Sequence, residues 1–386
     1  MKAIHNVKII TELGVLENHA VVFFDKISAI VSAEALPSYK IDERIDAGGN
    51  YLAPGFIDIH IHGCAGADTM DQDDSALDII SENLLQTGVT AFLPTTMTMD
   101  FSHVENALDR IRSRMGNSPG AQILGCHVEG PFINNDYKGA QDPQYIIAPE
   151  FTKISSFSDI IKVVTIAPEV SGSLAFIREA CANKIIVSIG HSAATYEEAM
   201  EAIASGASHV THTFNAMSAF NHRRPGILGA LTDTNATCEL IADNIHVHPA
   251  AQRLLLKLKG TTRVILVTDA MRACLMPDGS YDLGGQPVKV KDGKASLDSG
   301  VIAGSVLTLD KAIANIKAAS GLDISEIVNM VTLNPARKLG IDACKGSIAP
   351  GRDADMVIFD DKITVLATFI KGEIVYRRQS DGLQLT

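Results

Sequence analysis

The chain has 386 residues, of which 46% are apolar and 20% are charged, and its formal net charge is −12 with histidine counted as neutral. Since a typical barrel domain has ~250 residues, this length predicts one large domain together with a smaller one. The acidic balance argues against broad electrostatic binding to nucleic acid or to an anionic membrane, although a few arginines can still bind an anionic small molecule. The six cysteines are scattered without a CxxC pair, and no apolar stretch approaches the ~20 residues of a membrane span, so we expect free thiols in a cytoplasmic protein.

The first fifty residues contain short apolar runs bounded by Gly or Asp, a pattern typical of antiparallel strands. The last forty residues repeat this pattern, in KGSIAPGRDADMVIFD and KITVLATFIKGEIVYRR. Because the ends of a domain often lie close together, residues 1–53 and 345–386 are predicted to form one small β-sandwich domain.

Residues 54–344 alternate apolar strands with helical patterns. The predicted strands are 56–62, 89–94, 123–129, 163–167, 185–191, 209–212, 238–246 and 264–269. The predicted helices are 75–87, 102–115, 174–182, 195–205, 249–259 and 307–319, with a further helix near 325–333. Alternation implies parallel strands, and eight units imply a closed (β/α)₈ barrel of the TIM type, an α/β fold. The helical pattern after the third and sixth strands is weak, which predicts long loops there.

The first barrel strand carries an unusual set of polar residues. Side chains alternate faces along a strand, so Asp58, His60 and His62 share one face. Two histidines at i and i+2 near the carboxyl end of a strand can bind one metal ion. A lone pair of this kind is a weak motif, because a histidine at a strand end is often a structural residue.

Five further strands end in residues of the same chemical type. These residues are Glu129, His191, His212, His246 and Asp269. The active sites of barrel enzymes lie at the carboxyl ends of the strands, so the whole set is predicted to converge on one metal site. Imidazole and carboxylate ligands suit zinc, iron or another first-row divalent ion.

Several motifs resemble the amidohydrolase superfamily and, within it, the family of N-acetylglucosamine-6-phosphate deacetylases. They are HIHG at 60–63, HVEGPF at 127–132, GHS at 190–192, HTFNAM at 212–217, DNIHVHP at 243–249, VTDA at 267–270 and AGSVLTLD at 303–310. The resemblance covers nearly the whole chain. It implies a metal-dependent hydrolase of amino sugar metabolism that splits the acetamido group of N-acetyl-D-glucosamine 6-phosphate into the free amine and acetate.

The resemblance also implies roles for individual residues. Glu129, His191 and His212 would hold the principal metal, while His60 and His62 would hold a second one with Glu129 as the bridge. Some members of the family lack this HxH pair and use one zinc, so one or two divalent ions, zinc or iron, are expected per subunit.

The substrate-binding residues follow from the same resemblance. His246 would contact the substrate and polarise the amide carbonyl. Asn215, Ala216 and Arg223 match the phosphate-binding region, in which the arginine comes from the neighbouring subunit of a homodimer. From the residues alone, Arg223 and Arg224 can equally be a solvated pair. Where many relatives have histidine, this chain has Gln141, which puts a contact to a sugar hydroxyl in doubt.

The implied mechanism uses one carboxylate twice. A divalent metal lowers the pKa of a bound water to ~7, which supplies hydroxide as the nucleophile. Asp269 would accept the proton of that water and then pass it to the leaving amine.

Three alternatives remain open at this point. The substrate can be N-acetylgalactosamine 6-phosphate, the enzyme can be another amidohydrolase, or the chain can be an inactive scaffold. The segment 271–286, directly after the last barrel strand, can be a lid over the site or an ordinary excursion.

Overall fold

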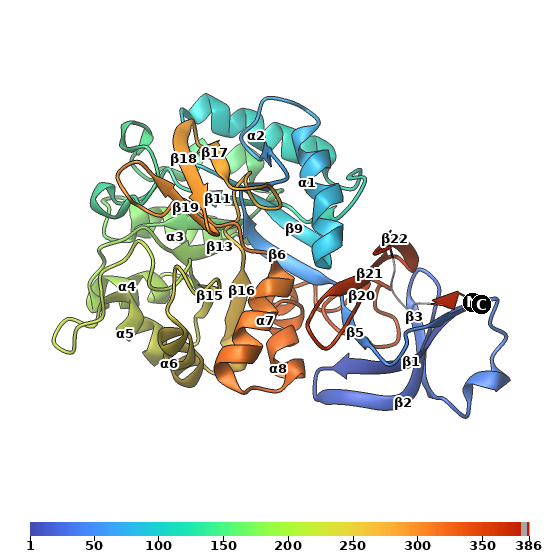
Figure 1. Cartoon of the computed structure of the whole chain (residues 1–386). Helices are drawn as coiled ribbons and strands as arrows, with labels where there is room; N and C mark the ends of the chain where they lie inside the picture. Colours follow the sequence, from blue (N-terminus) through green and yellow to red (C-terminus); the bar gives the residue numbers. More distant parts are fainter. Residues whose placement is uncertain (380–383, 386) are drawn as a thin grey trace.

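Eight parallel strands surround the centre of the larger part of the molecule (Figure 1). The structure is a computed structural model, and it describes residues 1–379 and 384–385. In barrel order the strands are β6 (Phe56–Ile61), β9 (Val89–Thr96), β11 (Cys126–Glu129), β12 (Ile161–Ile166), β13 (Ile186–Ile189), β14 (His209–Val210), β15 (Thr237–Ile241) and β16 (Val264–Val267). Just beyond β16, a parallel bridge joins Ala270 to Ile61, and Asp269 N–H donates to His60 O over 2.8 Å. These contacts bring the last strand back to the first, and the predicted barrel is confirmed.

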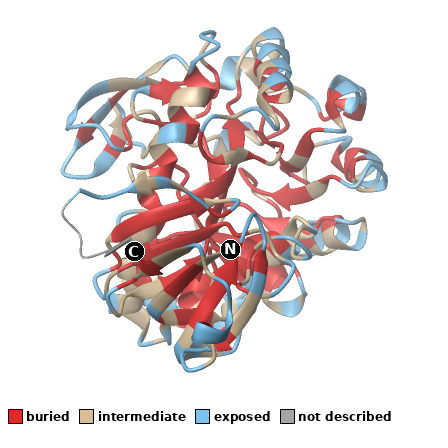
Figure 2. Ribbon diagram, turned by 90° about the vertical axis from the view of Figure 1, so that its right-hand side faces the viewer, coloured by how far each residue is buried: buried red, intermediate tan, exposed pale blue. Residues whose placement is uncertain are grey.

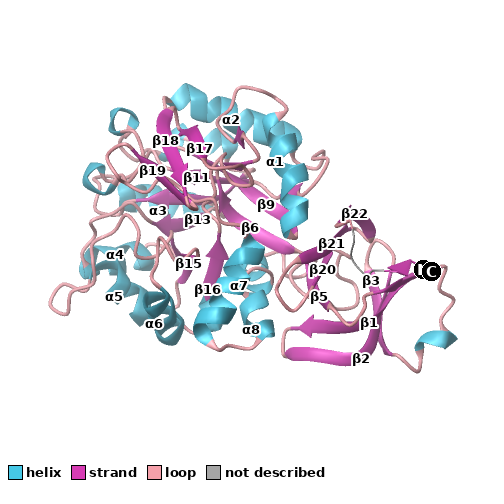
Figure 3. Cartoon of the chain, viewed as in Figure 1, coloured by secondary structure: helices cyan, strands magenta, loops and turns pink. Residues whose placement is uncertain are grey.

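Helices cover the outside of the barrel (Figure 3). They are α1 (Ala76–Leu84), α2 (Phe101–Arg114), α3 (Ser173–Ala182), α4 (Tyr196–Ala204), α5 (Gly226–Asp233), α6 (Pro249–Lys259), α7 (Leu309–Ser320), α8 (Ile324–Asn329) and α9 (Leu333–Lys338). The long loop predicted after the third strand is confirmed, since residues 130–160 form only short 3₁₀ turns. After the sixth strand a loop over 211–225 leads into α5, a helix that the sequence pattern did not reveal.

The single helix predicted over 325–333 is wrong, because two short helices, α8 and α9, occupy this region. Pro335 explains the break: its ring would clash with the carbonyl of Val331 in a continuous helix. That carbonyl instead accepts a hydrogen bond of 2.8 Å from Ile57 N–H on β6.

Strands from both ends of the chain form a second sheet beside the barrel (Figure 1). The amino-terminal strands are β1 (Lys2–Thr11), β2 (Gly14–Phe23), β3 (Ile27–Ser32), β4 (Glu43–Asp46) and β5 (Tyr51–Pro54); the carboxyl-terminal ones are β20 (Met356–Phe359), β21 (Val365–Ile370), β22 (Glu373–Arg377) and β23 (Gln384–Leu385). The main path of hydrogen-bonded neighbours is β22-β21-β20-β5-β1-β2-β3.

This sheet folds back on itself. Strands β2 and β21 are separated by three others, yet the rings of Phe23 and Phe369 lie 6.2 Å apart, edge to face. A flat sheet would hold them roughly 19 Å apart at the usual ~4.8 Å between strands. Its inner faces therefore enclose their own apolar core, which contains Ile9, Leu52 and Met356. Figure 2 shows both sets of buried strands, in the barrel and in this sheet.

A small antiparallel sheet follows the last barrel strand, formed by β17 (Gly279–Leu283), β18 (Gln286–Lys291) and β19 (Lys294–Leu297). The segment 271–286 is thus partly strand. It is the first part of a longer excursion, residues 271–308, which ends where α7 begins. In the part of the chain that the structure describes, no helix has the length and apolar character needed to cross a membrane. All six cysteines are free thiols, as predicted, and four of them are buried.

Candidate active site

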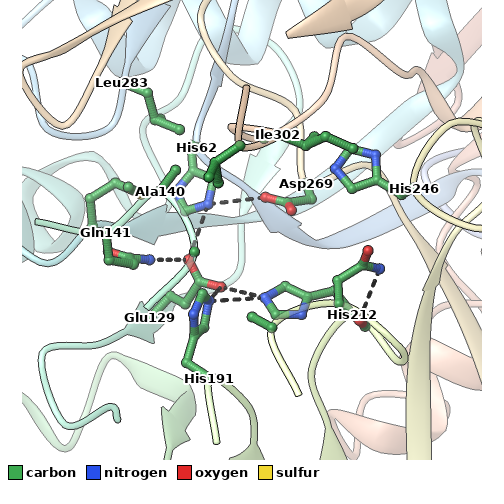
Figure 4. Close-up of a pocket in the computed structure, with 16 residues that line it drawn as sticks. His62, Glu129, Ala140, Gln141, His191, His212, His246, Asp269, Leu283 and Ile302 are labelled. Carbon is green, nitrogen blue, oxygen red and sulfur yellow. Dashed lines mark hydrogen bonds and ion pairs between the residues drawn. The ribbon is translucent and has the colours of Figure 1, made fainter. Parts of the chain in front are cut away.

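The residues predicted to bind metal converge at the carboxyl ends of the barrel strands (Figure 4). His60 lies on β6 and Glu129 is the last residue of β11. The other ligand candidates follow their strands by one or two residues: His62, His191, His212 and Asp269. All six are buried, and all but His60 line a cavity of about 260 Å³.

The carboxylate of Glu129 lies at the centre of this group. Its Oε1 lies 3.1 Å from His191 Nε2 and 3.0 Å from His212 Nε2. Its Oε2 lies 3.3 Å from His62 Nε2. Asp269 Oδ1 lies 3.2 Å from the same His62 nitrogen and 3.5 Å from His60 Nε2. Two groups of candidate ligands therefore adjoin at the cavity, Glu129–His191–His212 and His60–His62–Asp269, and a third group, His60–His127–Glu239, shares His60 with the second.

Hydrogen bonds on the far side of two histidine rings fix their orientation. His62 Nδ1–H donates to Thr95 O over 3.2 Å, and His191 Nδ1–H donates to Tyr137 O over 2.9 Å. Such outer bonds select the tautomer whose Nε2 lone pair faces inward, as metal-binding histidines require. In His60 the inward Nε2 is buried and has no hydrogen-bond partner among the described residues. The donor set and this unpartnered nitrogen fit a divalent cation.

Three of these residues have a left-handed backbone. The φ angles of His191, His212 and Asp269 are 49°, 25° and 48°. Such conformations cost about 1–3 kcal/mol each in residues other than glycine, and they cluster at functional sites. Gly190 contributes to the same geometry, because a Cβ there would lie 2.7 Å from Thr211 Cβ. Its missing side chain allows the ends of β13 and β14 to approach.

The charges of the site compensate one another. Burial acts to lower the pKa of His60, but the carboxylates of Glu239, Glu129 and Asp269 outweigh it and raise that pKa to about 9. Burial acts to raise the pKa of Glu129, yet His60 and His191 hold it well below its usual range. Protons on the histidines thus balance the buried carboxylates, and a bound cation would supply that positive charge instead.

Glu239 is an important residue that the sequence analysis missed. It lies on β15, fully buried, and its Oε2 accepts hydrogen bonds from His60 Nδ1–H and from His212 N–H, each over 2.9 Å. One carboxylate therefore orients a member of each candidate ligand group. An acidic residue within the apolar run CELIA was the available signal, since a buried carboxylate requires a partner.

His127 shares the site's face of β11 and groups with His60 and Glu239, but both of its ring nitrogens are already hydrogen-bonded. Its Nδ1–H donates to Ile59 O over 3.1 Å and its Nε2 accepts from Thr165 Oγ1–H over 2.8 Å. Burial, aided by His60, lowers its pKa to about 3. His127 is therefore a neutral ring that packs edge-on against His60, with centroids 4.5 Å apart.

Four predicted substrate-binding residues line the same cavity: Asn215, Ala216, His246 and Gln141. His246 follows a loop after β15, not the strand over 238–246 that was predicted; that strand ends at Ile241, and this part of the prediction is wrong. The carboxylate of Asp243 accepts a hydrogen bond from His246 Nδ1–H over 2.6 Å.

Arg223 does not reach this cavity within its own chain. It is exposed and lines a separate hollow of about 370 Å³ beside α4, together with Tyr137, Tyr196 and Arg224.

The part of the excursion after β16 that reaches the cavity is apolar: Leu283, Val301 and Ile302 line it together with Met97.

Comparisons with known proteins agree with this geometry. The amidohydrolase family model matches residues 51–375. An N-acetylglucosamine-6-phosphate deacetylase of Lysinibacillus sphaericus is 41% identical over 342 residues, which cover 86% of this chain and 87% of that relative. An N-acetylgalactosamine-6-phosphate deacetylase of Escherichia coli O157:H7 is 38% identical over 373 residues, 95% of this chain and 97% of that relative.

Two solved structures extend the similarity to three dimensions. The N-acetylglucosamine-6-phosphate deacetylase of Pasteurella multocida has a TM-score of 0.92 and 34% identity, covering 98% of this chain and all of that one. A mutant deacetylase of Mycobacterium smegmatis, in complex with N-acetyl-D-glucosamine-6-phosphate, has a TM-score of 0.90 and 30% identity, covering 97% of this chain and 98% of that one.

This chain therefore belongs to the amidohydrolase family, a family of hydrolases. Among its members, the chain is similar over most of its length to deacetylases of N-acetylated hexosamine 6-phosphates.

Proposed function

We propose that this protein hydrolyses the acetamido group of N-acetyl-D-glucosamine 6-phosphate, giving D-glucosamine 6-phosphate and acetate. The observation that carries the proposal is the convergence of Glu129, Asp269 and the four histidines of the two ligand groups beside a cavity of about 260 Å³. The named relatives and the complex with this sugar phosphate support the substrate class. The complete ligand set opposes the alternative of an inactive scaffold.

Two adjacent cation positions are part of this proposal. Glu129, His191 and His212 would hold one ion, and His60 and His62 the other, with Glu129 as the bridge and Asp269 beside it. We propose zinc or iron as the metal. Such an ion polarises a carbonyl group and makes water an effective nucleophile near neutral pH.

Asp269 is the proposed acid and base. It lies at the edge of the cavity, about 8% exposed, with Oδ1 next to the Nε2 atoms of His60 and His62. Burial acts to raise its pKa, but these two histidines lower it below the usual carboxyl value, so the group is ionised and ready to take a proton from water. The protonated acid can then give that proton to the departing amine.

His246 is the proposed partner of the amide oxygen. The bond from Nδ1–H to Asp243 turns the Nε2 side of the ring toward the cavity. A carboxylate on the far side of an imidazole fixes the ring and stabilises positive charge on it, as in hydrolases that use a similar pair. The ring can then donate to the oxygen as negative charge develops there.

Asn215 and Ala216 are proposed to bind the phosphate, with Arg223 from a second subunit. The Asn215 amide donates to His212 O over 3.2 Å, which fixes it at the cavity wall. Since Arg223 lies on an exposed loop outside its own cavity, a homodimer that exchanges this loop is consistent with its position. A fork-shaped guanidinium suits phosphate oxygens.

The 38% identical relative that acts on the galactosamine epimer supports a second candidate substrate, N-acetylgalactosamine 6-phosphate. The two sugars differ in one hydroxyl, so acetate release from each of them distinguishes the two candidates.

Two further expectations stay proposals. One places the boundaries between barrel and small domain at 53/54, within β5, and at 344/345. The other places the protein in the cytoplasm, where a phosphorylated sugar would be found.

The test is acetate release from three compounds: N-acetylglucosamine 6-phosphate, N-acetylgalactosamine 6-phosphate and unphosphorylated N-acetylglucosamine. We expect the first to react fastest and the unphosphorylated sugar to react poorly. Asp269→Asn should remove the activity, while Asp278→Asn, an exposed residue on the same excursion, should not. No acetate from any compound, with cations bound, would overturn the proposed function.

A further inference from the structure

Gln141 occupies a place in the site that its predicted role does not explain. Its side chain is 2% exposed, and both ends of its amide are engaged within the chain. Thr98 N–H donates to its Oε1 over 2.7 Å. Its Nε2–H donates to Glu129 Oε2 over 2.8 Å (Figure 4).

The orientation of this amide is fixed by chemistry. A backbone N–H can only donate, so the atom that faces Thr98 must be the oxygen, and the NH₂ group must face Glu129. Because the amide is neutral and does not titrate, it donates to that carboxylate at every pH at which the protein is folded. Gln141 thus links Thr98, two residues beyond the end of β9, to the last residue of β11.

The backbone around Gln141 is held against the same site. Tyr137 O accepts the hydrogen bond that orients His191, and a Cβ on Gly139 would lie 3.4 Å from His191 Cε1. Gln141 N–H closes a turn onto Lys138 O over 2.9 Å, and Gln286 donates to Ala140 O from the excursion after β16. The segment 137–141 therefore lies directly on the ligand groups, which limits the freedom of the Gln141 side chain.

The two oxygens of Glu129 have different neighbours. Oε1 faces His191 and His212, with His60 Nε2 farther away at 3.5 Å, whereas Oε2 faces His62 and Gln141. The hydrogen bond from Gln141 reaches Oε2 and not Oε1. It therefore opposes a rotation of the carboxylate that would take Oε2 away from His62.

We propose that Gln141 is a positioning residue that holds Glu129 as the bridge between the two cation positions, and that it mainly supports the position at His60 and His62. The inference rests on the proposed metal-dependent function. It gives Gln141 a role different from contact with a sugar hydroxyl. Changes in groups that orient metal ligands typically reduce metal affinity about 10–100-fold.

The experiment measures cation binding and catalysis separately. The metal-free protein is titrated with Co²⁺, and the intensity of its visible absorption reports the coordination of each ion. The variants are Gln141→Met, which keeps the length of the side chain, and Gln141→Ala, which removes the same donor without placing a thioether against Glu129. Gln144→Met is the control, because the side chain of this exposed residue of the same loop donates to Asp142 and not to a candidate ligand. His62→Ala identifies the binding step that belongs to its own position.

We expect the step that is lost in His62→Ala to weaken about 10–100-fold in both Gln141 variants, with a changed spectrum for that ion. The other step should stay within about twofold, kcat should fall, and KM for the sugar phosphate should change little. Binding steps equal to those of the wild type would overturn the proposal, as would a rise in KM alone, which indicates a sugar contact. A wild-type protein that binds one ion would also overturn it. Absence of acetate release from the wild type would refute the proposed function but leave the titration as a test of Gln141.

Discussion

Replacement of Glu239 by glutamine tests the buried carboxylate that joins the two ligand groups. Glutamine has the same shape, and its oxygen can take the place of Oε2, which accepts from His60 Nδ1–H and His212 N–H. Its NH₂ group would then lie where Oε1 lies, 3.3 Å from His209 Nε2, which can accept from it. The fold should therefore tolerate the change.

The expected magnitude follows from the loss of charge. Hydrogen bonds to charged groups contribute about 1.5–3 kcal/mol, against about 0.5–1.5 for neutral ones, so the two bonds together weaken by roughly 2 kcal/mol. His60 also becomes a poorer ligand, since the carboxylate behind it no longer raises its basicity. We expect the affinity for the cation at His60 and His62 to fall at least ~10-fold.

The assay is a cation titration of the metal-free protein together with urea unfolding, and Glu179→Gln on the exposed face of α3 is the control. A cation affinity within about twofold of the wild type would refute the reasoning, because the carboxylate would then be a structural residue alone. A decrease of more than about 4 kcal/mol in the free energy of unfolding would also contradict the reasoning, since such a decrease would show that the amide cannot replace the carboxylate.

Four further outcomes are expected. Asp269→Asn should lower kcat by ~10²–10⁴-fold with little change in cation content, and a kcat near that of the wild type would rule out its role as acid and base. Removal of the cations by a chelator should abolish acetate release and lower the melting temperature, because a ligand at 100 times its dissociation constant stabilises the folded state by about 2.7 kcal/mol. Readdition of the cations should restore acetate release and the melting temperature. Burial acts to raise the pKa of Asp243, but its hydrogen bonds with His246 outweigh burial and lower that pKa. This pair should therefore stabilise the fold at pH values above the ordinary carboxyl pKa of ~3.9, and the stabilisation should be lost as the pH falls through the lowered pKa. Asp243→Asn should thus flatten the acid side of the stability profile, and an unchanged profile would contradict the pairing. Phe369→Ala, in the core of the terminal sheet, should cost about 3–5 kcal/mol of unfolding free energy and leave kcat unchanged for the folded enzyme; a change below about 1 kcal/mol would argue against that core.

The barrel and its ligands could be predicted because strands of a parallel barrel share one polarity. Once a strand is recognised, its carboxyl end is known, and the residues at that end must meet those of the other strands. This reasoning predicted Glu129, His191 and Asp269 in one place, and the structure places them there. Alternation along the first strand likewise put Asp58 on the face of His60, where its carboxylate accepts from Thr268 Oγ1–H over 2.6 Å.

The rest could not be predicted, for physical reasons specific to each segment. The run 238–246 begins as a strand, but Asp243 caps a turn by accepting from the N–H groups of Ile245 and His246, and the strand ends before it, at Ile241. The strands β17–β19 are short and polar on their exposed side, so they resemble loop sequence. Arg223 lies outside the cavity of its own chain, so its proposed contact with the phosphate requires a second subunit, which the periodicity of the sequence does not reveal.

The sheet made from both ends of the chain has a consequence for synthesis. Strand β5 ends at Pro54 and pairs with β20, which begins at Met356, about 300 residues later. At ~5–20 residues per second, a ribosome needs roughly 15–60 seconds to make the intervening barrel, and during that time the edge of β5 has no neighbour from the other end. An unpaired apolar edge is where nascent chains associate with one another. Chaperone protection, or early docking of β5 onto the growing barrel, would therefore matter most in that interval, before the last strands leave the ribosome.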